Sequence, residues 1–216
     1  MSRLKSWIIG HQSRHQDSSP LTLKGRRVTL RPLSYLDYEQ WNEVRTRCHS
    51  WLTRWEPRLP NGPHVDVSEL AFKARVNSIE RDRELGTGFG FGIFYESHFV
   101  GEVNLSSIMR GAFQSGTVGY WIDKKVAGNG FMPESVALIL KFAFEILNLH
   151  RVEIAIVPRN TASTRVVEKL RLRFEGLSER FLLIDGVWED HNRFAILSDE
   201  WLERRQEIED EFIEST

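Results

Sequence analysis

Two glycines close a short loop in front of a long apolar segment, and this arrangement is typical of a site that binds a phosphate group. The loop is Lys125-Val126-Ala127-Gly128-Asn129-Gly130, and the apolar run from Pro133 to Leu147 predicts a helix. The first N–H groups of a helix have no internal acceptor, and the helix dipole adds partial positive charge there. Glycines let the chain curl so that its N–H groups point at an anion. The alternative is a tight strand-to-helix turn that binds nothing.

Two other nucleotide-binding motifs are excluded by their spacing. A P-loop ends in Gly-Lys followed by Ser or Thr, whereas this loop ends in Gly130-Phe131-Met132. The glycines at positions 86, 88, 90 and 92 alternate along a strand and lack the spacing of a dinucleotide-binding loop. We interpret that segment as a strand that other backbone approaches closely.

Three glutamates are candidates for accepting a proton or binding a cation. Glu56 lies between Trp55 and Pro57, and its carboxylate could accept a proton, directly or through water, or bind a cation. The alternative is a solvated loop charge, since exposed glutamates are the rule. Glu102, on a predicted strand, is the second candidate, and Glu179 is the third.

A second polar pair follows a predicted strand further along the chain. Asn160 suits the N-cap of the next helix, and its amide could also bind a ligand; the Ser163 hydroxyl could stabilise an oxyanion. Asp190-His191 is interpreted as a surface pair, because no nucleophilic serine pattern accompanies it. The Cys and His spacing predicts no metal site.

The composition describes one soluble domain rather than a nucleic-acid or membrane protein. The 216 residues suit a single domain with its own core. A formal charge of −1 without a basic stripe argues against nucleic acid as a partner. One cysteine, Cys48, cannot form an internal disulfide, which is consistent with a reducing compartment. No signal peptide or membrane span is expected, so a cytoplasmic location is the prediction.

The elements that must position these residues alternate between helices and strands. Polar residues 1–20 predict a flexible tail, 21–200 a single domain, and 201–216 an acidic helix or tail. The order within the domain is strand, helices, three strands, helix, strand, helix and two strands, which predicts a mixed α/β fold. The expected strands are 27–33, 86–95, 99–109, 117–122, 152–157, 181–184 and 193–197; the expected helices are 34–52, 67–85, 133–147 and 161–170.

Six segments carry a resemblance to a known family. The glycine loop resembles a pyrophosphate loop of the form Gln/Arg-x-x-Gly-x-Gly/Ala, although Lys125 departs from it. Gly119-Tyr120-Trp121-Ile122 resembles the strand that pairs with the pantetheine arm, and Asn160-x-x-Ser163 a second cofactor motif. The remaining matches are Trp51-Leu52 with Trp55-Glu56-Pro57, Arg110-Gly111-x-Phe113, and the segment from Leu182 to His191. Together these segments resemble the Gcn5-related N-acetyltransferase (GNAT) superfamily and, within it, the ribosomal-protein-alanine N-acetyltransferases of the RimJ/RimL type.

The resemblance implies a single GNAT-type α/β (α+β) domain with a mixed, mostly antiparallel sheet of about six to seven strands and helices on both faces. It implies acetyl-coenzyme A as cosubstrate, no metal, and direct transfer to a primary amine in a ternary complex. The expected catalytic residues are Glu56, Ser163 and Glu102. The expected cofactor-binding residues are Tyr120, Trp121, Ile122, Lys125, Val126, Ala127, Gly128, Asn129, Gly130, Phe131, Met132, Asn160 and Ser163.

The expected acceptor is the N-terminal α-amine of a protein, possibly a ribosomal one. A small-molecule amine and a non-catalytic acetyl-CoA sensor are the alternatives. Neither nucleic acid nor membrane is an expected partner, and the chain would be a monomer or a homodimer. Many relatives carry a tyrosine acid in the helix after Asn160, where this chain has Val167. The tyrosine mechanism therefore cannot be transferred to this chain.

Overall fold

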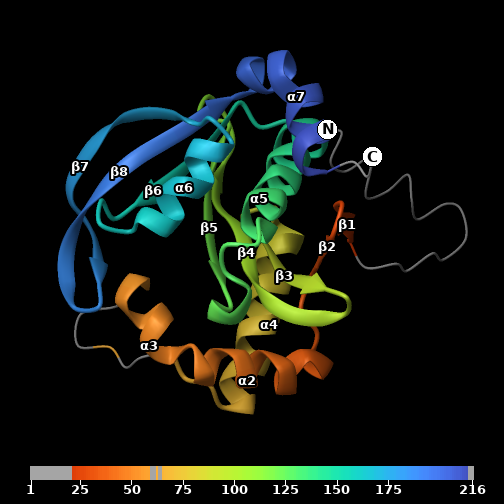
Figure 1. Ribbon diagram of the computed structural model, residues 1–216, viewed down its shortest axis with the longest axis vertical. Helices are drawn as coiled ribbons and strands as arrows, with labels where there is room; N and C mark the ends of the chain where they lie inside the picture. Colours follow the sequence, from red (N-terminus) through yellow and green to blue (C-terminus); the bar gives the residue numbers. More distant parts are fainter. Residues whose placement is uncertain (1–20, 59–61, 63–64, 214–216) are drawn as a thin grey trace, which may run out of the picture.

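One eight-stranded sheet organises the chain in a computed structural model that describes residues 21–58, 62 and 65–213. The strand order is β1-β2-β3-β4-β5-β6-β8-β7 (Figure 1). The strands are β1 (Leu23–Lys24), β2 (Val28–Arg31), β3 (Phe89–Tyr95), β4 (His98–Met109), β5 (Ser115–Ile122), β6 (Arg151–Ile156), β7 (Arg173–Ile184) and β8 (Val187–Leu197).

Every pair of neighbouring strands is antiparallel except β5 and β6, which are parallel. A parallel pair needs a long crossover, and α5 provides it here. The two strands are paired only where Ser115–Thr117 faces Arg151–Glu153, yet β5 continues to Ile122 and β6 to Ile156. Beyond those three pairs the strands diverge, so the sheet opens between Val118–Ile122 and Ile154–Ile156.

Helices cover both faces of the sheet, as the family resemblance implies. A large core packs around α5, whose residues Phe131–Leu140 are all buried, as expected for a helix that is apolar on every side. A smaller core on the other face joins α2 and α4 to Phe94 and Phe99. The helical segments are η1 (Tyr35–Asp37), α2 (Tyr38–Arg47), α3 (His49–Leu52), η2 (Thr53–Trp55), α4 (Glu69–Leu85), η3 (Lys124–Val126), α5 (Phe131–Lys141), η4 (Phe142–Ile146), α6 (Thr161–Lys169) and α7 (Ser198–Phe212).

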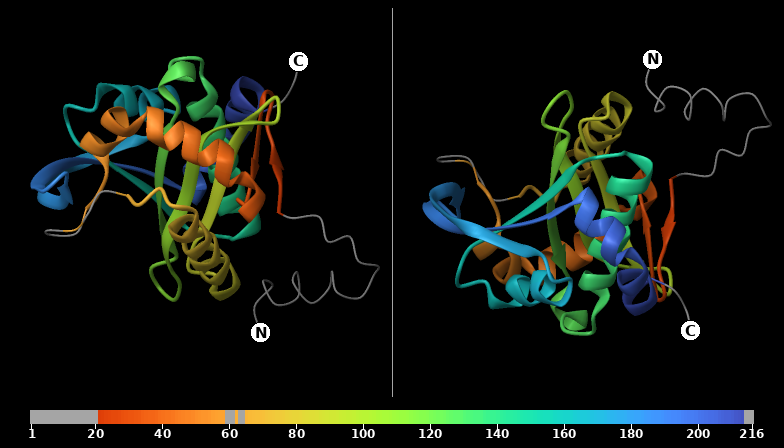
Figure 2. Two further views of the ribbon diagram at one scale, coloured as in Figure 1. Left: turned by 90° about the horizontal axis from the view of Figure 1, so that it is seen from below. Right: turned by 90° about the horizontal axis from the view of Figure 1, so that it is seen from above.

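The last two strands are much longer than the sequence predicts. They form one hairpin around Asp185-Gly186, and both turn residues have positive φ, as a tight two-residue hairpin turn requires. The hairpin tip lies beside α3, where Pro57 forms a bridge to Ile184 (Figure 2). The short expected strands missed this because polar and charged residues interrupt the alternation.

Other differences follow from local capping and from packing. The sheet has eight strands rather than six or seven, because short β1 pairs with β2 at the edge. Gly86 does not begin a strand but ends α4 in the left-handed conformation. The last helix begins at Ser198, and it packs on the core through buried Trp201 and Ile208. The predicted polar tail, residues 1–20, lies outside the described residues.

Candidate functional site

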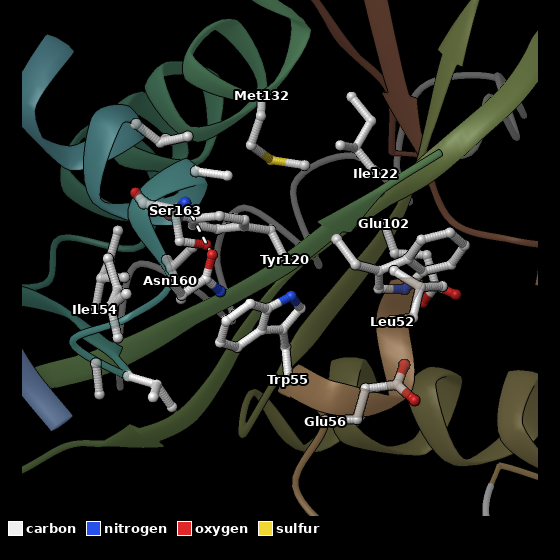
Figure 3. A pocket seen from close by; sticks show the side chains of 18 of the residues that line it. Leu52, Trp55, Glu56, Glu102, Tyr120, Ile122, Met132, Ile154, Asn160 and Ser163 are labelled. Atoms are coloured by element: carbon white, nitrogen blue, oxygen red, sulfur yellow. Dashed lines mark hydrogen bonds between the residues drawn. The ribbon is translucent and has the colours of Figure 1, made fainter. Parts of the chain in front are cut away.

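A cavity of about 1100 Å³ occupies the opening between β5 and β6. On one side its lining comes from the glycine loop, the start of α5 and the start of α6. On the other side it comes from α2, α3, η2 and the β7–β8 hairpin. Figure 3 shows Tyr120, Asn160 and Ser163 on the first side and Trp55 and Glu56 on the second. The site therefore has two compartments that meet where the strands diverge.

The glycine loop contributes N–H groups that have no hydrogen-bond acceptor in the described chain. Gly128 and Gly130 have φ of +87° and +83°, and Gly130 leads directly into α5. The N–H groups of Gly128, Gly130, Phe131 and Met132 have no acceptor among the hydrogen bonds of the described chain. All four residues line the cavity, as does Ala127. These are the features that backbone binding of a phosphate requires.

Three predicted loop residues do not line the cavity, and two of them hold the loop in shape. The Lys125 N–H donates to Asp123 at 3.0 Å, and the Asn129 carbonyl accepts from the Arg27 side chain at 2.8 Å. Val126 packs against the main core instead. A direct ligand contact remains a prediction for Lys125, Val126 and Asn129.

A buried glutamate fixes the loop from behind. Glu134, in the first turn of α5, accepts from the N–H groups of Arg27 and Val28 at 2.6 and 2.9 Å. The Arg27 side chain bonds both Glu134 and the Asn129 carbonyl. An acidic group in a first helical turn also interacts favourably with the helix dipole. The start of β2 therefore braces the loop.

Strand β5 lines the opening with three predicted residues, Tyr120, Trp121 and Ile122. Because side chains alternate along a strand, Tyr120 and Ile122 point to the side of α5 and α6. Trp121 points to the other side, where it packs edge-on against Phe99. The Tyr120 hydroxyl donates to the Ser163 carbonyl at 3.2 Å, and burial raises the pKa of Tyr120 well above its ordinary value.

At the start of α6, one side chain of the predicted pair caps the helix. The Asn160 carboxamide oxygen accepts from the Ser163 N–H at 3.2 Å, so the N-cap interpretation is confirmed. The carboxamide nitrogen has no partner among the described hydrogen bonds and is available to a ligand. Val167 is fully buried in the core, so the usual tyrosine position contributes no polar group to the site.

Both candidate carboxylates line the cavity, and each is held by an arginine. The two oxygens of Glu56 bond the two terminal nitrogens of Arg45, whose guanidinium stacks on Trp121. Glu102 is 1% exposed; one of its oxygens accepts from Trp41 at 2.8 Å and the other pairs with Arg75. The third candidate, Glu179, is exposed and does not line the cavity.

His191 was wrongly predicted to lie on the surface. It is 3% exposed, it lines the cavity, and its ring packs edge-on against Phe181. Its Nδ1 bonds the Glu189 carbonyl at 2.9 Å, whereas Asp190 accepts from the Arg180 N–H. The two neighbours thus form no dyad. Strand alternation extended back to Val187 would have placed them on opposite faces, but the predicted strand began only at Arg193.

Two further features limit the chemistry. Cys48 is buried outside the cavity lining, its thiol bonds Asp123 at 3.2 Å, and burial raises its pKa. In the described ranges, no three His, Cys, Asp or Glu side chains are grouped so that they could hold a metal ion. None of the described helices is long and apolar enough to cross a membrane.

Comparison with known proteins agrees with this geometry. Residues 27–173 match the family model "Acetyltransferase (GNAT) domain". The chain is 35% identical over 179 residues to "Probable N-acetyltransferase YjcK" of Bacillus subtilis (strain 168), covering 82% of this chain and 97% of that one. It is 28% identical to the "[Ribosomal protein uS5]-alanine N-acetyltransferase" of Escherichia coli (strain K12), covering 74% and 75%.

A solved structure shares the fold. Mycobacterium smegmatis RimJ, in complex with CoA-disulfide, superposes with a TM-score of 0.78 at 29% identity, covering 84% of this chain and 88% of that one. The expected single α/β domain is therefore confirmed, with one strand more than expected. The chain belongs to the GNAT family of acetyltransferases, which use acetyl-coenzyme A as the acetyl donor.

Proposed function

We propose that this N-acetyltransferase acts on the N-terminal α-amine of a protein, by direct transfer within a ternary complex. The observation that carries the proposal is the opening between β5 and β6, with unoccupied N–H groups on one side and an aromatic, charged compartment on the other. Two reactants that enter from opposite sides would meet at the opening. The name of the Escherichia coli relative, a ribosomal-protein-alanine N-acetyltransferase, supports this class of acceptor.

In this proposal the acetyl donor lies along β5. The pyrophosphate binds the N–H groups of Gly128 and Gly130 to Met132, and the pantetheine arm runs along the free edge of Val118–Ile122. The Asn160 carboxamide nitrogen bonds the arm. The thioester then lies near Ser163, whose hydroxyl is placed to meet the departing thiolate or the oxyanion. The larger part of the catalytic effect comes from holding both reactants in this geometry.

The acceptor amine enters beneath Trp55. Glu56 is bound to Arg45 through both of its oxygens, and we propose that its negative charge attracts the ammonium form of the acceptor. Glu102 contributes through Arg75 and Trp41, which it holds against the cavity. The expectation that Glu56 or Glu102 is the base is tested by substitution below.

An α-amine suits such a site better than a lysine does. Its ordinary pKa is about 7.7–8.0, against about 10.4 for lysine. Neutralising it at pH 7 costs on the order of 1 kcal/mol, against about 4–5 kcal/mol for lysine, at 1.36 kcal/mol per pKa unit. A cleft whose carboxylates are already paired favours the acceptor that is easier to neutralise.

Thiol release measures this function directly. The purified chain, with acetyl-CoA, is given a peptide that begins with alanine, and turnover is followed as free CoA. The matched control is the same peptide with a blocked N-terminus and an internal lysine. We expect release only with the free α-amine, and mass spectrometry should place the acetyl group on residue 1 of the peptide.

Other outcomes would replace the proposal. Turnover with small amines but not with the peptide would favour a small-molecule acceptor. Acetyl-CoA binding without turnover across both panels would favour a sensor. Ser163→Ala should lower kcat with little change in the Kd of acetyl-CoA if the hydroxyl acts in the transition state.

A further inference from the structure

We propose that His191 is the base that takes the proton from the acceptor amine. This inference rests on the proposed acetyl transfer and names a catalytic residue within the same cavity. His191 lines the acceptor compartment and is almost fully buried. It is paired with Ser178 of β7, and its neighbour Asn192 is paired with Ile156 of β6. His191 therefore lies on the strand next to β6, level with the end of the β6 segment that diverges from β5.

The hydrogen bond at Nδ1 determines which nitrogen can act. A carbonyl oxygen only accepts, so the 2.9 Å contact with the Glu189 carbonyl requires the proton on Nδ1. In the neutral ring the lone pair is then on Nε2. No described side chain or backbone group bonds Nε2. A backbone acceptor that fixes the tautomer and orientation of a histidine is an arrangement that a general base needs.

The surroundings keep this imidazole neutral. The charged groups that act on it are Glu189, Asp190 and Arg193. Burial is the largest effect on its pKa and lowers it below the ordinary value of about 6.5, and Arg193 acts in the same direction. At neutral pH the ring is therefore uncharged and able to accept a proton.

The other two proton acceptors of the cavity are already engaged. Both oxygens of Glu56 bond Arg45, and the two oxygens of Glu102 bond Trp41 and Arg75. Each arginine occupies lone pairs that an amine proton would need. Among the acidic and imidazole side chains that line the cavity, only His191 has an accepting atom without a protein partner.

The neutral amine nitrogen attacks the thioester carbonyl carbon, and a C–N bond forms. The nitrogen becomes positively charged and acidic, and Nε2 takes its proton directly or through one water. The tetrahedral intermediate collapses, the C–S bond breaks, and the thiolate is protonated from the Ser163 side or by water. The imidazolium finally returns its proton to solvent. From an ammonium substrate, the products are amide, CoA thiol and one proton.

The test compares His191→Gln with Asp190→Asn, using acetyl-CoA and the alanine peptide. The side chain of His191→Gln can still donate to the Glu189 carbonyl but is not a base. The side chain of Asp190→Asn can still accept from the Arg180 N–H. We expect His191→Gln to lower kcat by roughly 10²-fold or more, in the range typical of a general base. The Kd of acetyl-CoA by calorimetry and the thermal midpoint should stay close to wild type. Asp190→Asn should keep kcat.

Two readouts separate a base from a merely structural residue. In the wild type, kcat/KM should fall as the pH drops below the imidazole pKa, and this acidic limb should be missing in His191→Gln. Added imidazole should restore part of the rate of His191→Ala. A wild-type kcat in His191→Gln would overturn the inference. A lower kcat in His191→Gln would also overturn it if the acidic limb were unchanged and imidazole did not restore the rate of His191→Ala. Absence of turnover by the wild type with any amine would instead overturn the proposed function, and this inference with it.

Discussion

The hydroxyl of Tyr120 donates a hydrogen bond to the main-chain carbonyl of Ser163, and this 3.2 Å contact joins β5 to α6 across the opening of the sheet. The two residues come from the two segments proposed to hold the acetyl donor. The contact therefore sets the distance between the strand edge that carries the pantetheine and the helix start that carries Ser163.

The Tyr120 contact predicts a pH dependence of stability. Burial raises the pKa of Tyr120 in the folded chain, whereas the unfolded chain has the ordinary value of about 10. The folded state thus keeps a proton that the unfolded state loses, so this contribution is present below about pH 10 and is lost as the pH rises above it. Tyr120→Phe should cost about 1 kcal/mol at pH 7 for the lost hydrogen bond. Between pH 9 and 11, the free energy of unfolding measured in urea should fall less in Tyr120→Phe than in the wild type. An equal fall in the two proteins would contradict the assignment.

The glycine loop predicts a loss of cofactor affinity that strain alone cannot explain. Gly128 and Gly111 both have positive φ, +87° and +69°, and an added Cβ would meet no atom within 4 Å at either position. Alanine should therefore cost a similar 1–2 kcal/mol of backbone strain at both sites. Only Gly128 lines the cavity. Gly128→Ala should weaken acetyl-CoA binding by roughly tenfold or more, equivalent to 1.4 kcal/mol or more, while Gly111→Ala leaves it unchanged. If calorimetry gave Gly128→Ala and Gly111→Ala the same affinity for acetyl-CoA, the loop would not be part of the cofactor site.

Cys48 is predicted to take no part in catalysis. Burial raises its pKa and keeps the thiol protonated, and its hydrogen bond to Asp123 lies outside the cavity lining. Cys48→Ser, which keeps a donor, should retain kcat and most of the stability, and Cys48→Ala should retain kcat with a lower thermal midpoint. Mass spectrometry of the wild type with acetyl-CoA and no acceptor should show an unmodified chain. An acetyl adduct on Cys48 would overturn direct transfer.

Glu56 is predicted to act on binding rather than on chemistry. Glu56→Gln should raise the KM of the alanine peptide while kcat holds, because the charge that attracts the ammonium is gone. A fall in kcat of roughly 10²-fold would instead identify Glu56 as the base. The defect should shrink at higher pH, where the α-amine is already neutral.

Glu102→Gln is the matched control for Glu56→Gln. It leaves Arg75 without its buried partner, so the main expected effect is on the free energy of unfolding. Breaking such a pair costs about 3–5 kcal/mol in fully buried cases, and the cost is smaller here because the Arg75 side chain is 37% exposed.

Local signals in the sequence were enough for one compartment of the site. The glycine spacing, Pro133 and the capping preference of Asn160 all act within a few residues, so the loop, α5 and the start of α6 could be predicted. The acceptor compartment depends on contacts between distant segments. The pairing of Glu56 with Arg45, the burial of Glu102 beneath α2 and the place of His191 on a long hairpin have no local signature.

The divergence of β5 and β6 was also invisible in the sequence. Both segments have ordinary strand composition, and no local pattern marks the point after Thr117 and Glu153 at which their pairing stops. The resemblance to known acetyltransferases supplied the pantetheine strand, but the residues alone did not.

The short β5–β6 ladder also has a consequence for how the chain resists unfolding and proteolysis. Three residue pairs join a five-stranded half of the sheet to a three-stranded half, so a ligand seated in the opening would bridge halves that the ladder barely connects. Such a ligand binds the folded state alone, and at 100 times its Kd it adds about 2.7 kcal/mol to the free energy of unfolding. When acetyl-CoA is scarce, more molecules would be partly opened and exposed to proteases.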